Sequence, residues 1–336
     1  MATLPTLDFQ DYVAGGDRRA SFLKTLGETA REVGFFYLTG HGVPLEVSDG
    51  LVSLARKFFA LPQAEKEAID IANSPHFRGY TRIGNEHTRG RRDWRQQIDF
   101  GVDRPAIPQD GQQPLWTRLQ GPNQWPAALP ELEPAVRDWQ ARLEAVSVQL
   151  LEAFALALEL PADAFSAIYR EQPNHRLKVI HYPGRDIAED EQGVGAHKDG
   201  GFLTLLLQDR QAGLQVETDA GWVTAAPIRG SFVVNIGELL ELATNGYLRA
   251  TTHRVVAPPA GVDRISIAFF FAARLDTEIP LVSLPAHLAA LARGPASDPL
   301  NPMFRDTGLN QLKQRLRSHP DVAQRHYADI LHQFGL

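Results

Sequence analysis

The stretch that decides the fold lies at residues 193–209 and reads GVGAHKDGGFLTLLLQD. Its second half is a short apolar run between glycines and Asp209, a pattern typical of a buried β-strand. Similar short runs, rich in Val, Ile, Leu, Phe and Thr, recur around it between turn residues. Several short strands at near-regular spacing predict two facing sheets in a jelly roll. These runs are LKVIHYP (177–183), GLQVE (213–217), WVTAAP (222–227), SFVVNIG (231–237), THRVVAPP (252–259) and RISIAFFFAAR (264–274).

Helical patterns flank this β region on both sides, with one short aromatic strand among them. The predicted elements are a helix from Asp17, as its cap, to about Gly34, a strand over 35–38, a helix from Pro44 to Phe59, a long helix over about 133–158, and a C-terminal helix over 321–334 capped by Ser318.

We therefore predict an α+β fold in which a double-stranded β-helix, or jelly-roll, core is flanked by an N-terminal α/β region and C-terminal helices. Residues 1–172 form the N-terminal helical region with a few strands, and residues 173–285 form the jelly-roll core. Residues 286–336 are expected to form helices that pack on this core.

The composition of the 336 residues excludes several functional classes. Hydrophobic residues make up 43%, which is ordinary for a globular protein and excludes a disordered chain. The net charge of -6 argues against non-specific binding of nucleic acid, because neutralising phosphates requires a basic excess. Cysteine is absent, so any metal must be held by carboxylates and by some of the 11 histidines.

The sequence also indicates where the protein works. The most apolar stretch, residues 265–273, is far shorter than the roughly 18 to 20 residues of a spanning helix. The first residues, MATLPTLDFQDY, lack the basic and apolar regions of a signal peptide. We expect a cytoplasmic monomer or weak homodimer that acts on a small molecule, without nucleic-acid or membrane partners.

One metal-ligand pattern stands out in the β region, the triplet His197-Lys198-Asp199. On an extended chain, side chains i and i+2 share a face, so the imidazole and the carboxylate can converge on one ion. His253 follows on another predicted strand. Two neutral imidazoles and one carboxylate form the facial triad suited to non-haem Fe(II), although the same set also suits zinc.

A second pair of polar residues follows on the next predicted strand. Arg264 and Ser266 again stand at i and i+2 and share one face. They could offer a bidentate guanidinium and a hydroxyl to a carboxylate.

The pattern His-x-Asp also occurs a second time, at His319-Pro320-Asp321. This triplet stands at a predicted helix start, where Asp favours the helix dipole and Pro fits the first turn. No histidine follows it at a long distance, so we interpret it as a structural element and not as a metal site.

The order of these motifs identifies a family resemblance. H-x-D, a His some fifty residues later and R-x-S about ten residues beyond resemble the Fe(II)- and 2-oxoglutarate-dependent oxygenases, and most closely their isopenicillin N synthase-like branch. The likeness extends over most of the chain. It includes GFFYLTGHGVP, RGYTRIGNE, HYPG, FLTLLLQD, GLQV, NIGELLELATNG and THRVV.

The resemblance implies a function and a set of site residues. The enzyme would couple oxidative decarboxylation of 2-oxoglutarate to C–H oxidation of a small molecule, by hydroxylation, desaturation or cyclisation. O2 would be the oxidant, and residues 1–172 would be the N-terminal region typical of such dioxygenases. The implied residues are His197, Asp199 and His253 for catalytic Fe(II), Arg264, Ser266 and Tyr182 for 2-oxoglutarate, and Arg78 and Tyr80 for the mouth of the substrate site. Phe270, on the last predicted strand, is a further candidate for the substrate, although it could equally belong to the core.

Two positions depart from the family pattern. Lys198 stands where Ser or Thr is frequent, but alternation along the strand should turn it away from the metal. Ile180 stands where many members have Asn, two residues before Tyr182, near the expected position of the co-substrate.

Three other functions are compatible with parts of the pattern. An oxidase similar to isopenicillin N synthase would use Fe(II) and O2 without 2-oxoglutarate, with the Arg-x-Ser pair holding a carboxylate of the substrate. A zinc hydrolase could use the same triad, although no Glu or Asp in these strands is an obvious general base. A non-catalytic binding module would keep the barrel and lose the triad, which is intact here.

Overall fold

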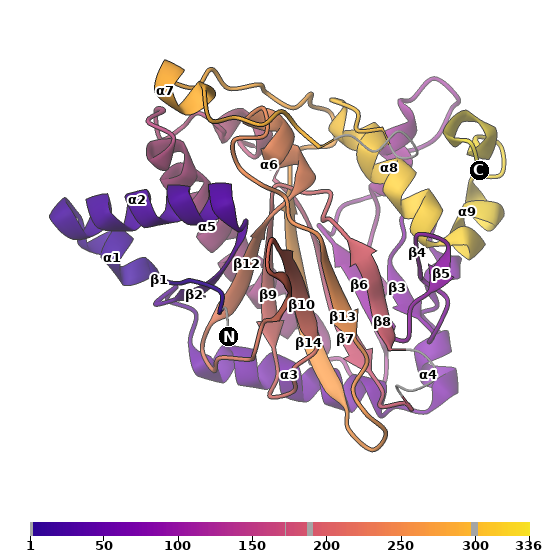
Figure 1. Ribbon diagram of the computed structural model, residues 1–336. Helices are drawn as coiled ribbons and strands as arrows, with labels where there is room; N and C mark the ends of the chain where they lie inside the picture. The colour runs from indigo at the N-terminus through magenta and orange to yellow at the C-terminus, as the bar shows by residue number, and fades with distance from the viewer. Residues whose placement is uncertain (1–2, 172, 187–190, 297–301) are drawn as a thin grey trace.

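The computed structural model describes residues 3–171, 173–186, 191–296 and 302–336. In this part of the chain, two β-sheets face each other (Figure 1). The larger sheet has eight strands and is antiparallel except where β1 joins β2. Its strands in spatial order are β1 (Thr6–Asp8), β2 (Phe35–Thr39), β12 (Phe232–Ile236), β9 (Leu203–Gln208), β14 (Arg264–Ala272), β7 (Asn174–Tyr182), β6 (Gln96–Gly101) and β3 (Gly79–Thr81).

The smaller sheet carries four strands among the described residues and lies in front of the larger one in Figure 1. A separate two-stranded hairpin stands beside it. The predicted strands are thus present, and the prediction of an α+β fold with a jelly-roll core is confirmed. The strands of the smaller sheet are β11 (Gly221–Thr224), β10 (Leu214–Thr218), β13 (His253–Val256) and β8 (Gln192–His197), and those of the hairpin are β4 (His87–Thr88) and β5 (Arg91–Arg92).

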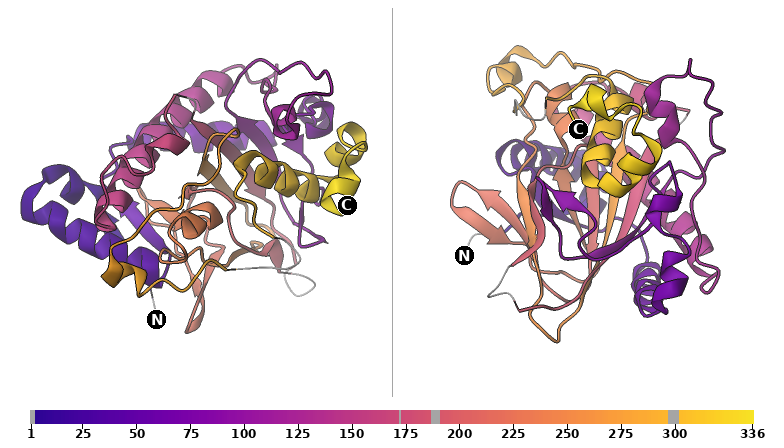
Figure 2. Two further views of the ribbon diagram at one scale, coloured as in Figure 1. Left: turned by 90° about the horizontal axis from the view of Figure 1, so that it is seen from above. Right: turned by 90° about the vertical axis from the view of Figure 1, so that its right-hand side faces the viewer.

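Two helices, α3 (Leu45–Phe59) and α5 (Leu132–Ala157), cover the outer face of the larger sheet, as the right-hand view in Figure 2 shows. No helix in the described ranges is both long enough and apolar enough to cross a membrane. The remaining helices are α1 (Phe9–Ala14), α2 (Gly16–Glu32), α4 (Gln63–Glu67), α6 (Glu238–Ala243), α7 (Ala286–Ala289), α8 (Thr307–Ser318) and α9 (Pro320–His326), with short 3-10 turns at Ile71–Asn73, Leu115–Leu119, Ser166–Ile168 and Leu331–Phe334.

Two predicted helix starts differ from the structure. Gly15 caps α2 without a side-chain bond, and Asp17 lies in its first turn. Ser318 ends α8 instead of capping the next helix, because its hydroxyl donates to the carbonyl of Gln314. The chain then turns at His319 into the short helix α9. The predicted boundary at residue 172 lies outside the described residues, and the three-part division of the chain stays a prediction.

Alternation along the strands divides the larger sheet into two chemically distinct faces. One set of side chains packs with the helices, for example Leu177, Val179 and Ile267. The other set points between the two sheets and packs with strands of the smaller sheet, for example Ile180 and Tyr182. We call these the outer and the inner face.

One row of neighbours crosses the inner face and places the site. Successive antiparallel pairings align Asn235, Thr204, Phe270, Arg176 and Gly101 on β12, β9, β14, β7 and β6. We call this set the inner row. Side chains directly opposite each other in such pairings have Cβ atoms about 4.5 to 5.5 Å apart. The inner row is therefore a continuous line of contacts from one side of the site to the other.

Candidate active site

Three predicted ligands meet at the ends of two paired strands. His197 ends β8 and is the register partner of His253, which begins β13. Asp199 follows two residues after His197, and its Oδ1 lies 3.6 Å from His197 Nε2 and 3.7 Å from His253 Nε2. The three ligand atoms all lie within 4.8 Å of one another. The structure therefore brings the whole triad together in a geometry that could hold one metal ion.

Hydrogen bonds orient each ligand. Thr204 Oγ1 and Asn235 Nδ2 donate to Asp199 Oδ2, at 2.6 and 2.9 Å, which leaves Oδ1 facing the two imidazoles. The Nδ1 atoms of His197 and His253 lie 2.8 and 3.2 Å from the carbonyls of Gly195 and Thr251, each two residues earlier in the chain. Such outer bonds fix the tautomer and leave Nε2 as the metal ligand.

The charges of the triad depend on one another. Burial alone would raise the pKa of Asp199, but the neighbouring His253 and His197 hold this pKa well below its usual range. Burial and the nearby His197 lower the pKa of His253 to about 4. For His197, burial is outweighed by the bond to Asp199, so its pKa is raised. A carboxylate between two imidazoles suits a divalent cation. When such a cation binds, it takes the place of a proton on the imidazoles.

The loop that carries Asp199 is fastened by the start of α6. The backbone N–H groups of Gly237, Glu238 and Leu239 donate to the carbonyls of Phe202, Asp199 and Gly201, at 2.9, 2.7 and 3.1 Å. A Cβ at Gly237 would lie only 2.1 Å from the carbonyl oxygen of Gly201. The two loops can approach this closely only because residue 237 has no side chain.

The Arg-x-Ser pair lies deeper on the same inner face. Arg264 is fully buried, and its guanidinium lies 4.9 Å from the centroid of the Tyr182 ring. Its Nη2 donates to Gln208 Oε1 at 2.9 Å, and its Nε donates to the carbonyl of Gln211 at 3.3 Å. Its Nη1 is buried without a hydrogen-bond partner. Leaving a buried charged donor unpaired is costly, so this atom fits an anionic ligand that the site is built to take.

Ser266 lies on the same strand as Arg264, and the neighbouring strand β7 places one residue beside each of them. Tyr182 is the register partner of Arg264, and Ile180 is the register partner of Ser266. Ser266 and Ile180 are both buried on the inner face. The departure from the family pattern therefore places an apolar side chain directly beside the Ser266 hydroxyl.

The structure separates the three residues that we predicted for the substrate. Phe270 belongs to the inner row, next to Thr204, and so lies one strand from the residue that holds Asp199. Arg78 is buried, and its Nη1 and Nη2 donate to the carbonyls of His76 and Leu119. Its guanidinium also lies over Gly101, the last member of the inner row.

Tyr80 is not brought to the site. It lies on the outer face, where its ring packs near Phe58 and its hydroxyl donates to Gln96 Oε1 at 2.7 Å. Because β3 is only three residues long, its sequence gives no alternation from which this orientation could have been predicted.

Sequence reasoning missed three residues that hydrogen-bond to the predicted site residues, namely Thr204, Asn235 and Gln208. A signal was present for some of them, since Asn235 is the polar member of the apolar strand FVVNI and Thr204 interrupts LTLLL. Their position two residues from other inward side chains predicts an inner orientation once the strand is known.

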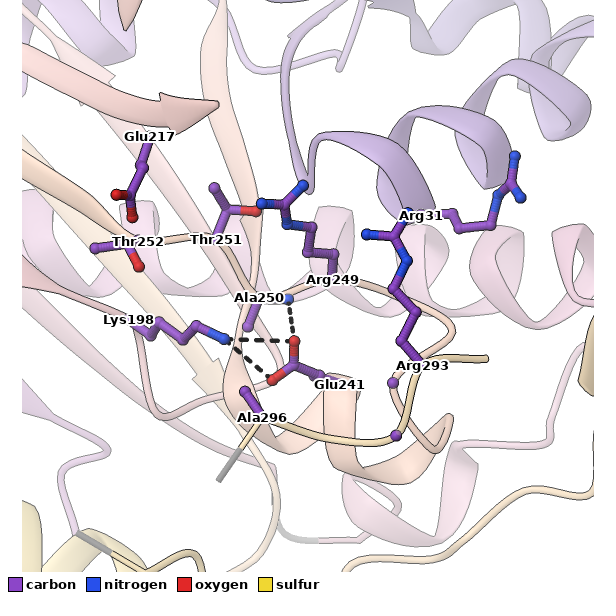
Figure 3. Close-up of a pocket in the computed structure, with 12 residues that line it drawn as sticks. Arg31, Lys198, Glu217, Glu241, Arg249, Ala250, Thr251, Thr252, Arg293 and Ala296 are labelled. Atoms are coloured by element: carbon purple, nitrogen blue, oxygen red, sulfur yellow. Dashed lines mark hydrogen bonds and ion pairs between the residues drawn. The ribbon is translucent and has the colours of Figure 1, made fainter. Parts of the chain in front are cut away.

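Lys198 points away from the triad, as strand alternation predicts. Its Nζ lies 3.3 Å from Glu241 Oε2, at the edge of a cavity of about 240 Å³ (Figure 3). Figure 3 shows the side chains of Arg249 and Arg293 around the same cavity. This cavity is lined by Lys198 but by none of the three triad residues.

Comparison with known proteins agrees with this geometry. Residues 4–128 match the family described as non-haem dioxygenase in morphine synthesis N-terminal, and residues 173–273 match the 2OG-Fe(II) oxygenase superfamily. A 2-oxoglutarate-dependent dioxygenase of Dothideomycetidae sp. (strain 11243) is 35% identical over 350 residues, covering 98% of this chain and 94% of the relative.

Two further comparisons extend the likeness. A homoarginine-6-hydroxylase of Arabidopsis thaliana is 34% identical over 266 residues, covering 77% of this chain and 79% of the relative. The crystal structure of a 2OG-Fe(II) oxygenase family protein from Caulobacter crescentus superposes with a TM-score of 0.75 at 30% identity, covering 94% and 100% of the two chains. The chain therefore belongs to the 2OG-Fe(II) oxygenase superfamily and is a dioxygenase that uses Fe(II), 2-oxoglutarate and O2 to oxidise a small molecule.

Proposed function

We propose that His197, Asp199 and His253 bind the Fe(II) of this enzyme. The observation that carries the proposal is the convergence of their three ligand atoms within 4.8 Å on two paired strands. Two imidazoles and one carboxylate on one side of an iron leave the remaining positions open for small ligands. Thr204 and Asn235 position the Asp199 carboxylate so that one oxygen stays directed at the metal.

Arg264, Ser266 and Tyr182 are proposed to receive the distal carboxylate of 2-oxoglutarate. The buried Nη1 of Arg264, without a partner in the described structure, supports this role. Bound together, Fe(II), 2-oxoglutarate and O2 supply oxidation of a C–H bond coupled to decarboxylation of the 2-oxo acid to succinate. The Tyr182 ring supports the guanidinium from one side, while Gln208 fixes one of its edges.

Hydroxylation is the reaction that we propose among the three alternatives. The support comes from relatives about 34% identical that are named as homoarginine-6-hydroxylases. We also propose a cytoplasmic location, which the absence of cysteine from the sequence supports. We propose in addition that the protein is a monomer or a weak homodimer.

One experiment tests both site assignments. Iron content, binding of 2-oxoglutarate and release of succinate are measured for the wild type and for His253→Ala, Arg264→Ala and Arg254→Ala. We expect His253→Ala to lose iron. Arg264→Ala should keep iron but bind 2-oxoglutarate about ten- to a hundred-fold more weakly, because it loses a charge-assisted pair worth ~1.5 to 3 kcal/mol.

Arg254→Ala is the matched control. This arginine adjoins His253 in sequence, but its side chain pairs with Glu191 at 2.9 Å and lies over the ring of Trp222. Its removal should leave both affinities unchanged. A wild-type protein that binds iron but neither binds 2-oxoglutarate nor forms succinate would instead support the oxidase similar to isopenicillin N synthase.

A further inference from the structure

Arg176 occupies a position on the inner row that the proposed chemistry does not use. Thr204, which donates to Asp199, is the register partner of Phe270, and Phe270 is the register partner of Arg176. The guanidinium of Arg176 lies 5.3 Å from the centroid of the Phe270 ring. Two strand spacings, about 10 Å, therefore separate Arg176 from the residue that holds a metal ligand.

The other charges between β6, β7 and α8 largely pair with one another. Three buried carboxylates face three buried cations in this region, so their charges cancel. The contacts are Arg95 to Glu86 at 2.8 Å and to Asp93 at 3.2 Å, Lys178 to Glu86 at 2.5 Å and to Asp99 at 3.9 Å, and Arg315 to Asp99 at 3.0 Å.

Arg176 takes part in none of these pairs. Within the described residues it makes no ion pair, and its Nε is buried without a hydrogen-bond partner. Arg78, the other cation in excess, is held by two backbone carbonyls. Burial and the neighbouring Arg315 lower the pKa of Arg176 to about 10, against raising effects of Asp99, Asp199 and Glu86, and this value leaves Arg176 charged at neutral pH.

The ligands of the proposed function do not neutralise this charge. Fe(II) carries two positive charges and Asp199 one negative charge, while 2-oxoglutarate carries two negative charges and Arg264 one positive charge. The charges of these four groups sum to zero when the ligands are bound. Arg176 therefore remains an unpaired cation near the metal site. A partly buried guanidinium is stabilised when a carboxylate fits its planar pair of donors.

We infer that the primary substrate is a small organic acid whose carboxylate pairs with Arg176 and whose apolar part packs on Phe270. This inference rests on the proposed function, because it assigns the substrate class of the same site. A carboxylate matches a single free guanidinium in both charge and shape. A phosphate monoester carries more charge than one guanidinium balances.

The first test concerns the protein without substrate. Melting temperatures are compared for the wild type, Arg176→Met and Arg315→Gln, each with Fe(II) and 2-oxoglutarate under anaerobic conditions. Arg176→Met keeps much of the side-chain length but removes an unpaired, partly buried charge, so its melting temperature should equal or exceed that of the wild type. Arg315→Gln is the matched control and should melt lower, because it leaves Asp99 with a weaker partner. A fall for Arg176→Met as large as that for Arg315→Gln would assign Arg176 to structural stabilisation and overturn the inference.

The second test uses defined probes at saturating 2-oxoglutarate. Hexanoate and phenylacetate should raise the melting temperature of the wild type more than hexanamide and phenylacetamide, and Arg176→Met should abolish this difference. Equal effects of acids and amides, no effect of any probe, or a difference that survives in Arg176→Met would each overturn the inference. A larger effect of phenyl phosphate than of phenylacetate would overturn the carboxylate class.

The same measurements separate this inference from the proposed function. 2-Oxoglutarate alone should stabilise both the wild type and Arg176→Met, because its site lies at Arg264. If 2-oxoglutarate stabilises neither protein, the proposed function fails. If it stabilises both and the carboxylate probes fail, only the substrate class is wrong.

Discussion

The same three-residue pattern occurs twice in this chain and has two different structures. His197-Lys198-Asp199 follows the course of a strand end, and its imidazole and carboxylate meet with 3.6 Å between Nε2 and Oδ1. His319-Pro320-Asp321 stands at the junction of α8 and α9. There His319 is buried, with Nε2 3.5 Å from Glu86 Oε1, while Asp321 is exposed and accepts a hydrogen bond from Asn85.

The difference shows that backbone geometry decides whether the pattern can bind metal. In extended chain, residues i and i+2 point to the same side. At a helix start each residue rotates by about 100°, so residues i and i+2 point to nearly opposite sides. The sequence interpretation of the second triplet as a helix start is confirmed, since Pro320 is the first residue of α9. The burial of His319 among charged groups was not predicted.

The largest effect should separate the two aspartates. Asp199→Ala removes a metal ligand, and we expect iron content and 2-oxoglutarate turnover to fall to background. Asp321→Ala should leave both unchanged and lower the free energy of unfolding by at most about 0.5 to 1 kcal/mol, from the lost interaction with the helix dipole. Elemental analysis and succinate release measure the first effects, and denaturant titration the second. Loss of iron from Asp321→Ala would mean that the wrong triplet has been chosen.

The two histidines should differ in the kind of effect. His319→Ala removes a fully buried ring that packs near Phe77, and should lower the free energy of unfolding by about 2 to 4 kcal/mol with iron content retained. His197→Ala removes a half-buried ring and should lose iron at a smaller cost in stability of the metal-free protein. Urea titration beside elemental analysis measures both. Loss of iron from a folded His319→Ala variant would contradict the structural role assigned to the second triplet.

A third effect comes from pH. Burial and Arg315 of α8 lower the pKa of His319 to about 3, against raising effects of Glu86 and Asp99 and a lowering effect of Lys178. Because the unfolded chain binds this proton near pH 6.5 and the folded chain does not, stability is lost as the pH falls from about 6.5 towards 3. At pH 5 the loss should be about 2 kcal/mol.

His319→Gln tests this prediction because it cannot titrate. Between pH 7 and pH 5, the melting temperature of the wild type should fall more than that of the variant. The variant keeps the buried carboxylates of the cluster, so the difference between the two slopes reports His319 together with its coupling to Glu86 and Asp99. Parallel slopes would show that His319 titrates normally in the folded protein.

We expect the smallest effects on stability from the central residues of the two His-x-Asp triplets. Lys198→Ala removes a partly exposed ion pair with Glu241, and Pro320→Ala removes a residue suited to the first turn of a helix. Each should lower the free energy of unfolding by about 1 kcal/mol or less, with full iron content. Iron loss in Lys198→Ala would mean that its orientation away from the metal does not persist in solution.

The strands and the His197-x-Asp199 pair could be predicted from the sequence because both rest on short-range periodicity, whereas His253 was assigned by its place in the order of motifs. The partners of the triad could not, since Thr204 and Asn235 become neighbours of Asp199 only through the pairing of β9 with β12. The alternation of Arg176 and Lys178 with apolar residues was visible in β7. It suggests a solvated face, however, until the smaller sheet is known to cover that side.

The hydrogen bonds that hold the Asp199 loop against the start of α6 limit which amino-acid substitutions are tolerated there. All three hydrogen bonds from the start of α6 use main-chain atoms only. Side chains at positions 238 and 239 can therefore change during evolution without loss of the fastening, provided that proline is avoided. Position 237 has no such freedom, because any side chain there would collide with the carbonyl of Gly201. A single glycine codon, distant from every metal ligand in the sequence, thus limits which descendants of this enzyme keep their iron.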